Sequence, residues 1–321
     1  MLAIRRTAPD PDGRLTGIEI ADRPAPPRPD GWTTVRLKSA SVNHSDLAAV
    51  RGPGFEPGTH RVLGIDGAGL DEDGNEVIVY PIVSGPGYAD PLYDPDLRAL
   101  SQGLDGTWAE EVHVPRANLI PKPAGLSWDH AACLGTAWLT AYRMLFGRAD
   151  LKPGETVLVQ GAGGGVSTAL ISLGVAAGLR VWVTSRDPDR GERAVTELGA
   201  HAAFSPGARL PEQVDAAMDA TGRATFAHSL RSVRTGGRLV TAGAVTGGTT
   251  DLDLADLFIR SISLHGSAMG SPTDLRNLAR HCATGGARPK IDSTWPLHDA
   301  KPGIARALAG DQFGKIVLHC A

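Results

Sequence analysis

The chain has 321 residues, and its 32 Lys and Arg against 35 Asp and Glu leave a formal net charge of −3 at pH 7. The chain therefore lacks the excess of basic residues that is typical of a nucleic-acid-binding protein. A hydrophobic content of 42% with 21% charged residues is typical of a globular protein of about two domains and excludes disorder as the main state. No apolar run approaches the roughly 20 residues of a membrane-spanning helix, and the charged start MLAIRRTAPDPDG does not resemble a signal peptide. We therefore expect a cytoplasmic protein that binds neither nucleic acid nor membrane.

The cysteine content points to the same compartment. Cys133, Cys282 and Cys320 are too few and too scattered for a disulfide framework, which agrees with a reducing environment. They also cannot build a zinc site of four cysteines.

The first 119 residues carry short β-type runs separated by turns. The runs cover 33–42, 60–69 and 75–83, and they predict a small antiparallel β-rich unit. Proline, glycine and acidic residues crowd the segment 84–97, which predicts an irregular excursion.

The pattern changes at Ser127. Apolar residues at helical spacing predict one long, largely buried helix that starts after Ser127 and ends before Gly147. Strands and helices then alternate over about 120 residues, which predicts a parallel sheet covered on both faces. The predicted strands are 156–160, 180–184, 202–204, 214–219 and 238–243, and the predicted helices are 165–177, 189–198 and 224–233.

The most informative segment is TVLVQGAGGGVSTA, residues 156–169. A strand runs directly into a glycine cluster and then into a helix, so the backbone can approach a pyrophosphate and direct free N–H groups toward it. Ser167 stands where a third glycine is expected, and its short side chain still permits close packing. The segment predicts a dinucleotide site that includes Gly161, Gly163, Gly164, Gly165 and Val166.

The end of the next strand indicates which dinucleotide fits. An NAD site usually has Asp or Glu there to bind the ribose, whereas this chain has Thr184, Ser185 and Arg186, followed by Arg190. Because a guanidinium matches phosphate geometry, Ser185, Arg186 and Arg190 favour a 2′-phosphate and hence NADPH. NAD stays an alternative cofactor, because the carboxylate of Asp187 follows Arg186 directly.

Several segments together resemble the medium-chain dehydrogenase/reductase superfamily, and within it the zinc-independent quinone oxidoreductase branch. They are SASVNHSDLAAVRG, VLGIDGAG, GTWAEEVHVPRANLIPKP, LTAYRML, VLVQGAGGGVS, GGRLVTAGAV and FGKIVL, in that order along nearly the whole chain. The resemblance implies a GroES-like β-rich catalytic domain over 1–123, a Rossmann domain with a doubly wound parallel sheet over 124–261, and a tail, 262–321, that returns to the Rossmann sheet edge and the catalytic domain. It also implies a homodimer, for which SISLHGS (261–267) is a candidate edge strand.

The resemblance places the ligands of the catalytic zinc of related enzymes at Asn43, Ile65 and Thr136. None of the three supplies a thiolate or an imidazole, so we expect no metal. Without a Lewis acid, hydride transfer to a quinone or an α,β-unsaturated carbonyl is favoured, because conjugation spreads the incoming charge.

The remaining site residues are also implied by the resemblance. Asn43, His44, Ser45 and Thr140 are the candidate catalytic residues, and Thr136, Thr140, Gly243, Ala244, Ser267, Met269 and Lys315 join the glycine segment as candidate cofactor contacts. His44 is alternatively a loop histidine bonded to backbone, and Lys315 a surface lysine.

Other polar and aromatic residues have simpler expected roles. Asp46 and Asp66 are expected to hold their loops through backbone N–H groups. Tyr88, Tyr93 and Trp108 are candidate walls of a substrate pocket.

Three further functions stay open. One is a dedicated biosynthetic enoyl reductase with a bulky substrate, another is a protein that binds NADP(H) without catalysis, and the third is a metal-dependent alcohol dehydrogenase. A serine hydrolase is excluded, since the chain has no G-x-S-x-G.

Overall fold

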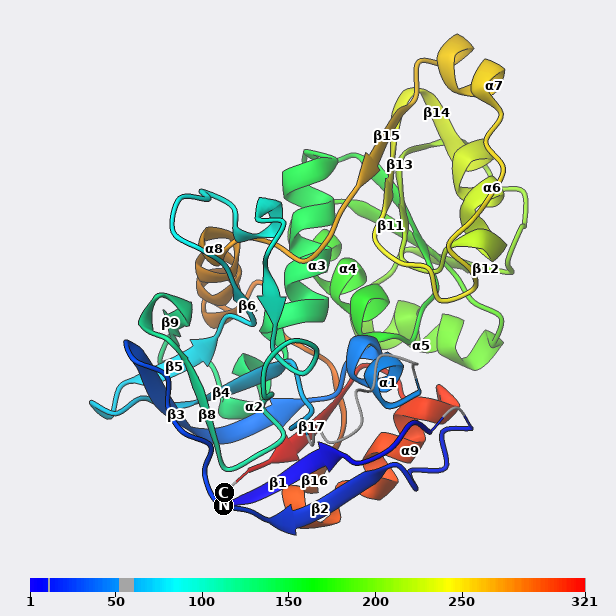
Figure 1. Cartoon of the computed structure of the whole chain (residues 1–321). Helices are drawn as coiled ribbons and strands as arrows, with labels where there is room; N and C mark the ends of the chain where they lie inside the picture. Colours follow the sequence, from blue (N-terminus) through cyan, green and yellow to red (C-terminus); the bar gives the residue numbers. More distant parts are fainter. Residues whose placement is uncertain (11, 52–60, 321) are drawn as a thin grey trace. The chain divides into compact units, whose positions relative to one another are not determined.

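The computed structural model describes residues 1–10, 12–51 and 61–320, and the chain divides into two compact units (Figure 1). Unit 1 comprises Met1–Ala137, Gly270–Gly285 and Pro289–Ala321. Unit 2 comprises Trp138–Met269 with Gly286–Arg288. The last part of the chain therefore returns to the unit in which the chain begins.

Unit 1 is built on a seven-stranded sheet in which β3 is central. The sheet order is β16-β17-β3-β4-β5-β9, with β8 also paired to β3, and every pair is antiparallel except β16 with β17. Its strands are β3 (Trp32–Ser41), β4 (Asp66–Leu70), β5 (Glu76–Val79), β8 (Glu111–Pro115), β9 (Leu119–Pro121), β16 (Ile291–Pro296) and β17 (Lys315–His319). The antiparallel β-rich unit predicted from the sequence is confirmed.

Two small ribbons and short helices complete unit 1. The strand pairs are β1 (Leu2–Arg6) with β2 (Ile18–Asp22) and β6 (Ile82–Val83) with β7 (Arg98–Ala99). The helices are α1 (His44–Arg51), α2 (Trp128–Ala131), α8 (Pro272–Ala283) and α9 (Lys301–Ala309), with 3₁₀ turns η1 (Pro91–Tyr93), η2 (Arg116–Asn118) and η5 (Leu297–Asp299).

Two predicted runs of unit 1 differ from the observed strands. The run 75–83 is split into β5 and β6 at Pro81, which has no N–H to donate to a ladder. In the run 60–69, residue 60 lies outside the described residues and the strand β4 begins only at Asp66. The predicted excursion 84–97 contains only η1, as expected for an irregular segment.

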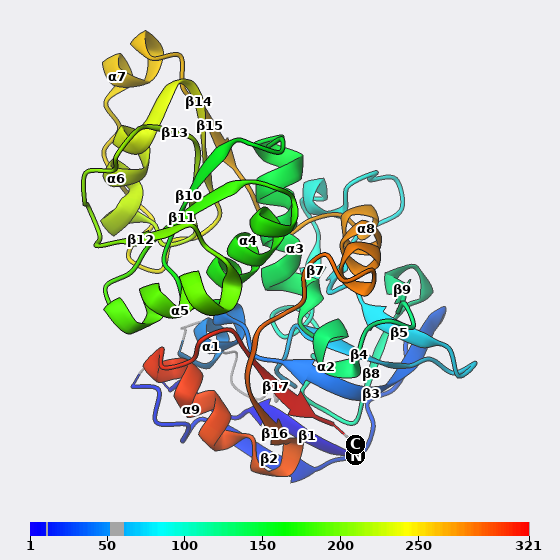
Figure 2. The same ribbon diagram turned by 180° about the vertical axis from the view of Figure 1, so that it is seen from behind.

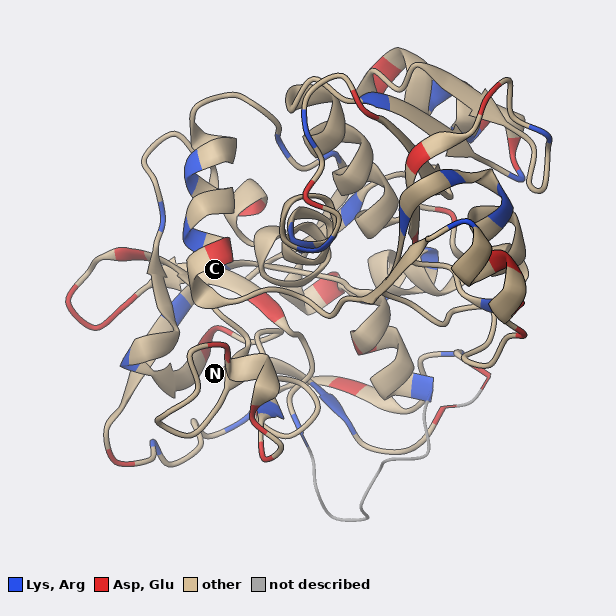
Figure 3. Ribbon diagram, turned by 90° about the horizontal axis from the view of Figure 1, so that it is seen from above, with Lys and Arg blue, Asp and Glu red and all other residues tan. Residues whose placement is uncertain are grey.

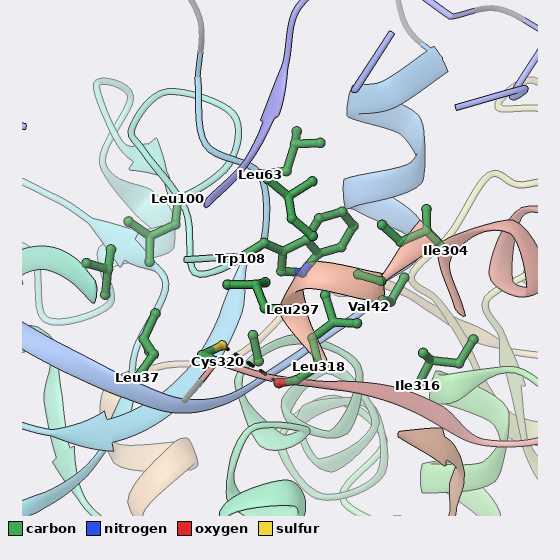
Figure 4. Packing of buried hydrophobic residues seen from close by; sticks show 14 of the residues in the cluster. Leu37, Val42, Leu63, Leu100, Trp108, Leu297, Ile304, Ile316, Leu318 and Cys320 are labelled. Carbon is green, nitrogen blue, oxygen red and sulfur yellow. Dashed lines mark hydrogen bonds between the residues drawn. The ribbon is translucent and has the colours of Figure 1, made fainter. Parts of the chain in front are cut away.

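The core of unit 1 forms around Trp108 (Figure 4). This side chain is fully buried with Leu63, Leu297 and Leu318, and its indole Nε1 donates to the Ser41 carbonyl at 3.3 Å. The prediction that Trp108 lines a substrate pocket is wrong, because the indole is fully buried in the hydrophobic core of unit 1. Tyr88 and Tyr93 are exposed.

Unit 2 is a six-stranded parallel sheet in the order β12-β11-β10-β13-β14-β15. The strands are β10 (Thr156–Gln160), β11 (Arg180–Thr184), β12 (Ala202–Phe204), β13 (Val214–Asp219), β14 (Val233–Thr241) and β15 (Ser263–Gly266). The first four match the predicted strands residue for residue, and β14 begins five residues earlier than the predicted strand that starts at 238. This sheet and the β-rich unit 1 confirm the predicted α/β fold class.

Helices cover both faces of this sheet (Figure 2). They are α4 (Gly165–Ala176), α5 (Pro188–Leu198), α6 (Arg223–Ser232) and α7 (Leu254–Ile259). α4 and α5 contact each other, whereas α6 packs on β10, β13 and β14. The strand order reverses direction after β12, and right-handed crossovers therefore place α6 on the face opposite α4 and α5.

The predicted long helix is interrupted by π-helical turns. Helical structure covers 128–131 and 134–148, as α2, the π segment η3 (Leu134–Trp138), α3 (Leu139–Tyr142) and the π segment η4 (Arg143–Arg148). Ser127 caps the start as predicted, because its Oγ accepts from the His130 N–H at 3.2 Å. Gly147 lies inside η4 and not after the end. The widened turn η3 occurs where Gly135 approaches Asp66 so closely that an added Cβ would lie 2.6 Å from Asp66 Oδ1.

The surface has no single dominant charge. Figure 3 shows basic and acidic residues interspersed along the ribbon of both units. Within the described parts of the chain, no helix has the length and apolar character needed to cross a membrane.

Candidate functional site

The glycine turn lies between β10 and α4 in unit 2. Gly161 has φ of +92°, the left-handed region that glycine adopts without strain, and Gly164 is the N-cap residue of α4. A Cβ added at Gly164 would meet no heavy atom within 4 Å, so space is open in front of the helix N-terminus. Because Gly164 has no side-chain oxygen to cap the first turn, the N–H groups there stay available to an anion. The turn therefore fits a pyrophosphate.

Ser167 completes this turn from within α4. It is buried, and its Oγ donates to the Gln160 carbonyl at 3.4 Å. The short side chain thus lies against the turn where a third glycine was expected, as the sequence predicted.

The end of β11 presents groups of both charges. Ser185 Oγ donates to the Asp187 carbonyl at 2.6 Å and accepts from its N–H at 3.2 Å. Asp187 caps α5 through Asp189 N and lies 3.4 Å from Arg190, while Arg186 is exposed. A guanidinium and a carboxylate therefore lie at the same turn.

Two further segments follow the carboxyl ends of strands in unit 2. Gly243 and Ala244 come after β14, and a Cβ on Gly243 would lie 2.2 Å from the Ala220 carbonyl oxygen. Ser267 comes after β15, and its N–H donates to the Thr241 carbonyl at 2.9 Å. Since all strands of the sheet are parallel, these segments share one edge with the glycine turn, the edge at which ligands of open α/β sheets lie.

Two further predicted residues of unit 2, Thr140 and Met269, precede and follow the strands of this sheet in the sequence. Thr140 is buried in α3, and Met269, with φ of +36°, ends the segment that follows β15. The structure thus gathers Gly161, Gly163, Gly164, Gly165, Val166, Ser185, Arg186, Gly243, Ala244 and Ser267 at the carboxyl edge of one sheet.

A buried polar network lies in unit 1. The carboxylate of Asp66 accepts from Thr136 Oγ1 at 2.6 Å, from Asn43 Nδ2 at 2.9 Å and from Ser41 Oγ at 3.3 Å. Asp66 is fully buried. The expectation that Asp66 binds backbone N–H groups is wrong, since these three donors are side chains.

Lys315 belongs to the same network. Its ammonium donates to Asn43 Oδ1 at 2.5 Å and to the Val42 carbonyl at 2.8 Å, and it lies 3.9 Å from Asp66 Oδ2. The side chain is only 2% exposed, so the alternative of a surface lysine is wrong. β17 brings Lys315 to the end of β3, with which it pairs.

These donors do not suit zinc. Asn43 and Thr136 use their side chains to bind Asp66, Ile65 has no donor atom, and the Lys315 ammonium repels a cation. Among the described residues, no group of three or more His, Cys, Asp and Glu is placed to hold a metal ion.

Asp46 is a second buried carboxyl beside this network. Its Oδ2 accepts from the Asn43 N–H at 3.0 Å, as predicted, while Oδ1 is buried with no hydrogen-bond partner in the described structure. Burial, reinforced by the charge of Asp66, raises the pKa of Asp46 to about 7, against the opposing effects of the Asn43 N–H, Lys315 and Ser101. The ammonium of Lys315 therefore contacts Asp66 directly and opposes the rise in the pKa of Asp46 without cancelling it.

His44 and Ser45 begin α1. His44 is exposed, and desolvation together with the charge of Arg51 lowers the pKa of its imidazole. His44 is the first residue of the helix α1 and so does not lie in a loop. Ser45 Oγ is buried without a hydrogen-bond partner in the same part of the chain.

Comparisons with known proteins agree with this architecture. The family model described as "Zinc-binding dehydrogenase" matches residues 165–284. Acryloyl-coenzyme A reductase of Metallosphaera sedula is 26% identical over 95% of this chain and 97% of its own, and crotonyl-CoA carboxylase/reductase of Cereibacter sphaeroides is 26% identical over 83% and 74%. A crystal structure described as an NAD-dependent alcohol dehydrogenase is 31% identical, covers 100% of both chains and has a TM-score of 0.87. With likeness to that structure over its whole length, the chain belongs to the medium-chain dehydrogenase/reductase superfamily.

Proposed function

We propose that this protein is an NADPH-dependent, zinc-independent oxidoreductase that reduces a quinone or an α,β-unsaturated carbonyl compound. The observation that carries the proposal is the occupation of the metal-ligand positions by the Asp66 network, in a chain whose second unit has an open glycine turn at a helix N-terminus. An amide, an alkyl group and a hydroxyl stand at the positions where related enzymes need thiolate or imidazole ligands, and a buried ammonium contacts the amide.

The glycine turn and the end of β11 are assigned to the cofactor. The N-terminus of α4 would hold the pyrophosphate, and Ser185, Arg186 and Arg190 the 2′-phosphate. When bound, the nicotinamide supplies the hydride. The resemblance adds Thr136, Thr140, Gly243, Ala244, Ser267, Met269 and Lys315 as contacts.

Asn43, His44, Ser45 and Thr140 are proposed to orient the acceptor and donate hydrogen bonds to its oxygen. Ser45 Oγ is buried and has no hydrogen-bond partner among the described residues, so its hydroxyl hydrogen is not committed to another group. A conjugated acceptor suits this set, because its charge is spread and hydrogen bonds suffice without a Lewis acid.

An enoyl-thioester reductase is the second candidate. It is favoured by the likeness to acryloyl-coenzyme A reductase, which spans almost the full length of both chains. The reaction type is the same, so only the acceptor distinguishes the two. A protein that binds NADP(H) without turnover remains the non-catalytic alternative.

A panel of acceptors tests the proposal. Purified protein is mixed with NADPH or NADH and, separately, with a naphthoquinone, crotonyl-CoA or an unconjugated aldehyde, and the loss of reduced nicotinamide is followed while bound zinc is measured by elemental analysis. We expect NADPH oxidation with a conjugated acceptor, none with the aldehyde, and no stoichiometric zinc. Turnover restricted to crotonyl-CoA would select the enoyl-thioester reductase. Reduction of the aldehyde by zinc-loaded protein, or binding without any turnover, would overturn the proposal.

A further inference from the structure

A row of three buried polar side chains lies behind the glycine turn in unit 2. His228 of α6 is 8% exposed, Gln160 at the end of β10 is 1% exposed, and Thr184 at the end of β11 is 2% exposed. Gln160 Nε2 lies 2.9 Å from His228 Nδ1, and Thr184 Oγ1 donates to Gln160 Oε1 at 2.7 Å.

The hydrogen bonds of the row have one direction. The Ala208 carbonyl, 2.9 Å from His228 Nε2, can only accept, so this nitrogen carries the hydrogen. In neutral His228, Nδ1 is then an acceptor, and Gln160 donates to it through Nε2. Gln160 Oε1 is left to accept from Thr184, whose hydroxyl hydrogen is thereby used.

The row ends on the backbone of the glycine turn. With its hydrogen used, Thr184 Oγ1 still has lone pairs, and it accepts from the Gly161 N–H at 3.3 Å. Gly161 is the residue with φ of +92° that turns the chain from β10 toward α4. Thr184 also precedes Ser185, so one row of side chains connects the predicted pyrophosphate site with the predicted 2′-phosphate site.

Burial of three polar side chains is costly, and apolar residues would fill the same space. Each group is stable there only because its partners are satisfied. The same side of the sheet carries an apolar core around Leu158, Phe226 and Leu230, and a second buried polar cluster in which Ser229 of α6 donates to Asp219 at the end of β13. The row lies at the carboxyl ends of β10 and β11, the edge at which ligands of open α/β sheets bind.

We propose that His228 is a positioning residue that, through Gln160 and Thr184, holds the Gly161 turn in the geometry that binds the dinucleotide. The inference rests on the proposed function, since it concerns the cofactor site of that function. His228 acts through the row and does not touch the cofactor.

Paired variants separate positioning from packing. Thr184→Val removes the hydroxyl at nearly constant volume and Thr184→Ser keeps it, while His228→Leu removes both ring nitrogens and His228→Gln keeps one donor and one acceptor. The dissociation constants of NADPH and NADH are measured by nicotinamide fluorescence, together with Tm, KM for the cofactor and kcat. We expect Thr184→Val and His228→Leu each to raise the dissociation constant about 5- to 20-fold, and the double variant little further, because all three break the same row. Thr184→Ser and His228→Gln should stay within about 3-fold, and kcat at saturation should change little, so that the loss appears in KM.

The outcomes distinguish this inference from the proposed function. If the wild-type protein binds neither nicotinamide dinucleotide, the proposed function itself fails. If the wild-type protein binds one and both removal variants bind it equally well, or His228→Gln is as impaired as His228→Leu, only the positioning role is overturned. If His228→Leu does not fold, the dissociation constants of Thr184→Val and Thr184→Ser test the row: equal values in these two variants would overturn the positioning role.

Discussion

Asp46 illustrates how burial sets the behaviour of a single residue. Its carboxyl is fully buried, one oxygen has no hydrogen-bond partner in the described structure, and the nearby ammonium of Lys315 lies 3.9 Å from Asp66. A protonated carboxyl avoids a second negative charge in this space, which is why the pKa of Asp46 rises to about 7. We therefore expect Asp46 to couple the stability of unit 1 to pH.

The sign of this coupling follows from the raised pKa. The contribution to stability is fully present below the unfolded pKa, near 3.8, and is lost as pH rises through about 7. Asp46→Asn removes this titration, so we expect the variant to lose less stability than wild type between pH 5 and pH 8.5, by on the order of 2–4 kcal/mol in the free energy of unfolding. Urea unfolding at the two pH values measures the difference. The exposed carboxylate variant Asp73→Asn is the control and should follow wild type; identical pH dependence in wild type and Asp46→Asn would show that Asp46 ionises freely in the folded state.

At the scale of one element, α4 combines two uses of a helix N-terminus. Gly164 has φ of −75°, which any residue adopts, and the space around its missing Cβ is open. An N-cap carboxylate or amide would therefore stabilise the helix, whereas the glycine leaves the first-turn N–H groups to a ligand. Gly164 therefore makes α4 less stable than a capping side chain would at this position.

Gly164→Asp should therefore have opposite effects on stability and binding. We expect the free energy of unfolding to rise by about 1 kcal/mol from capping, and the dissociation constant of NADPH to rise more than about 50-fold, because a fixed negative charge occupies the pyrophosphate position. Thermal unfolding and nicotinamide fluorescence test the two effects. Gly164→Asn, a neutral cap of the same shape, should stabilise similarly and weaken binding less. Unchanged NADPH affinity in Gly164→Asp would place the pyrophosphate away from α4.

At the scale of the whole molecule, unit 2 has an open sheet edge. β15 pairs only with β14 in the described sheet, and Leu264 on it is 38% exposed. The preceding helix α7 exposes Leu254 at 65%, Phe258 at 69% and Ile259 at 69%. Uncovered apolar residues beside an unpaired strand are a typical self-association surface, and we propose that the homodimer expected from the resemblance forms here.

A charge on this edge should separate the subunits. In size-exclusion chromatography with light scattering, we expect wild type at twice the 33.5 kDa of one chain and Leu264→Lys shifted to a single chain. Tyr93→Lys, on an exposed aromatic residue of unit 1, should remain like wild type. A monomeric wild type, or a dimer unaffected by Leu264→Lys, would argue against this interface.

The sequence by itself determined the elements that depend on local chemistry. β10 to β13 have the predicted bounds and α5 begins one residue before the predicted helix, because alternation, helical spacing and capping residues act over a few neighbours. The glycine turn was predictable for the same reason, since its positive φ and the following helix are encoded within about ten residues.

Only the tertiary structure decided the polar networks. Lys315 bonds Asn43 across 272 residues, Thr136 bonds Asp66 across 70, and His228 meets Gln160 across 68. Each of these residues has an ordinary local sequence, so no pattern indicated that Lys315 is buried or that π-helical turns would bring Thr136 to Asp66. Which side chains are buried, and which partners they bind, is decided when strands distant in the sequence pair. That pairing places Lys315 and Asp66 together in the buried polar network of unit 1.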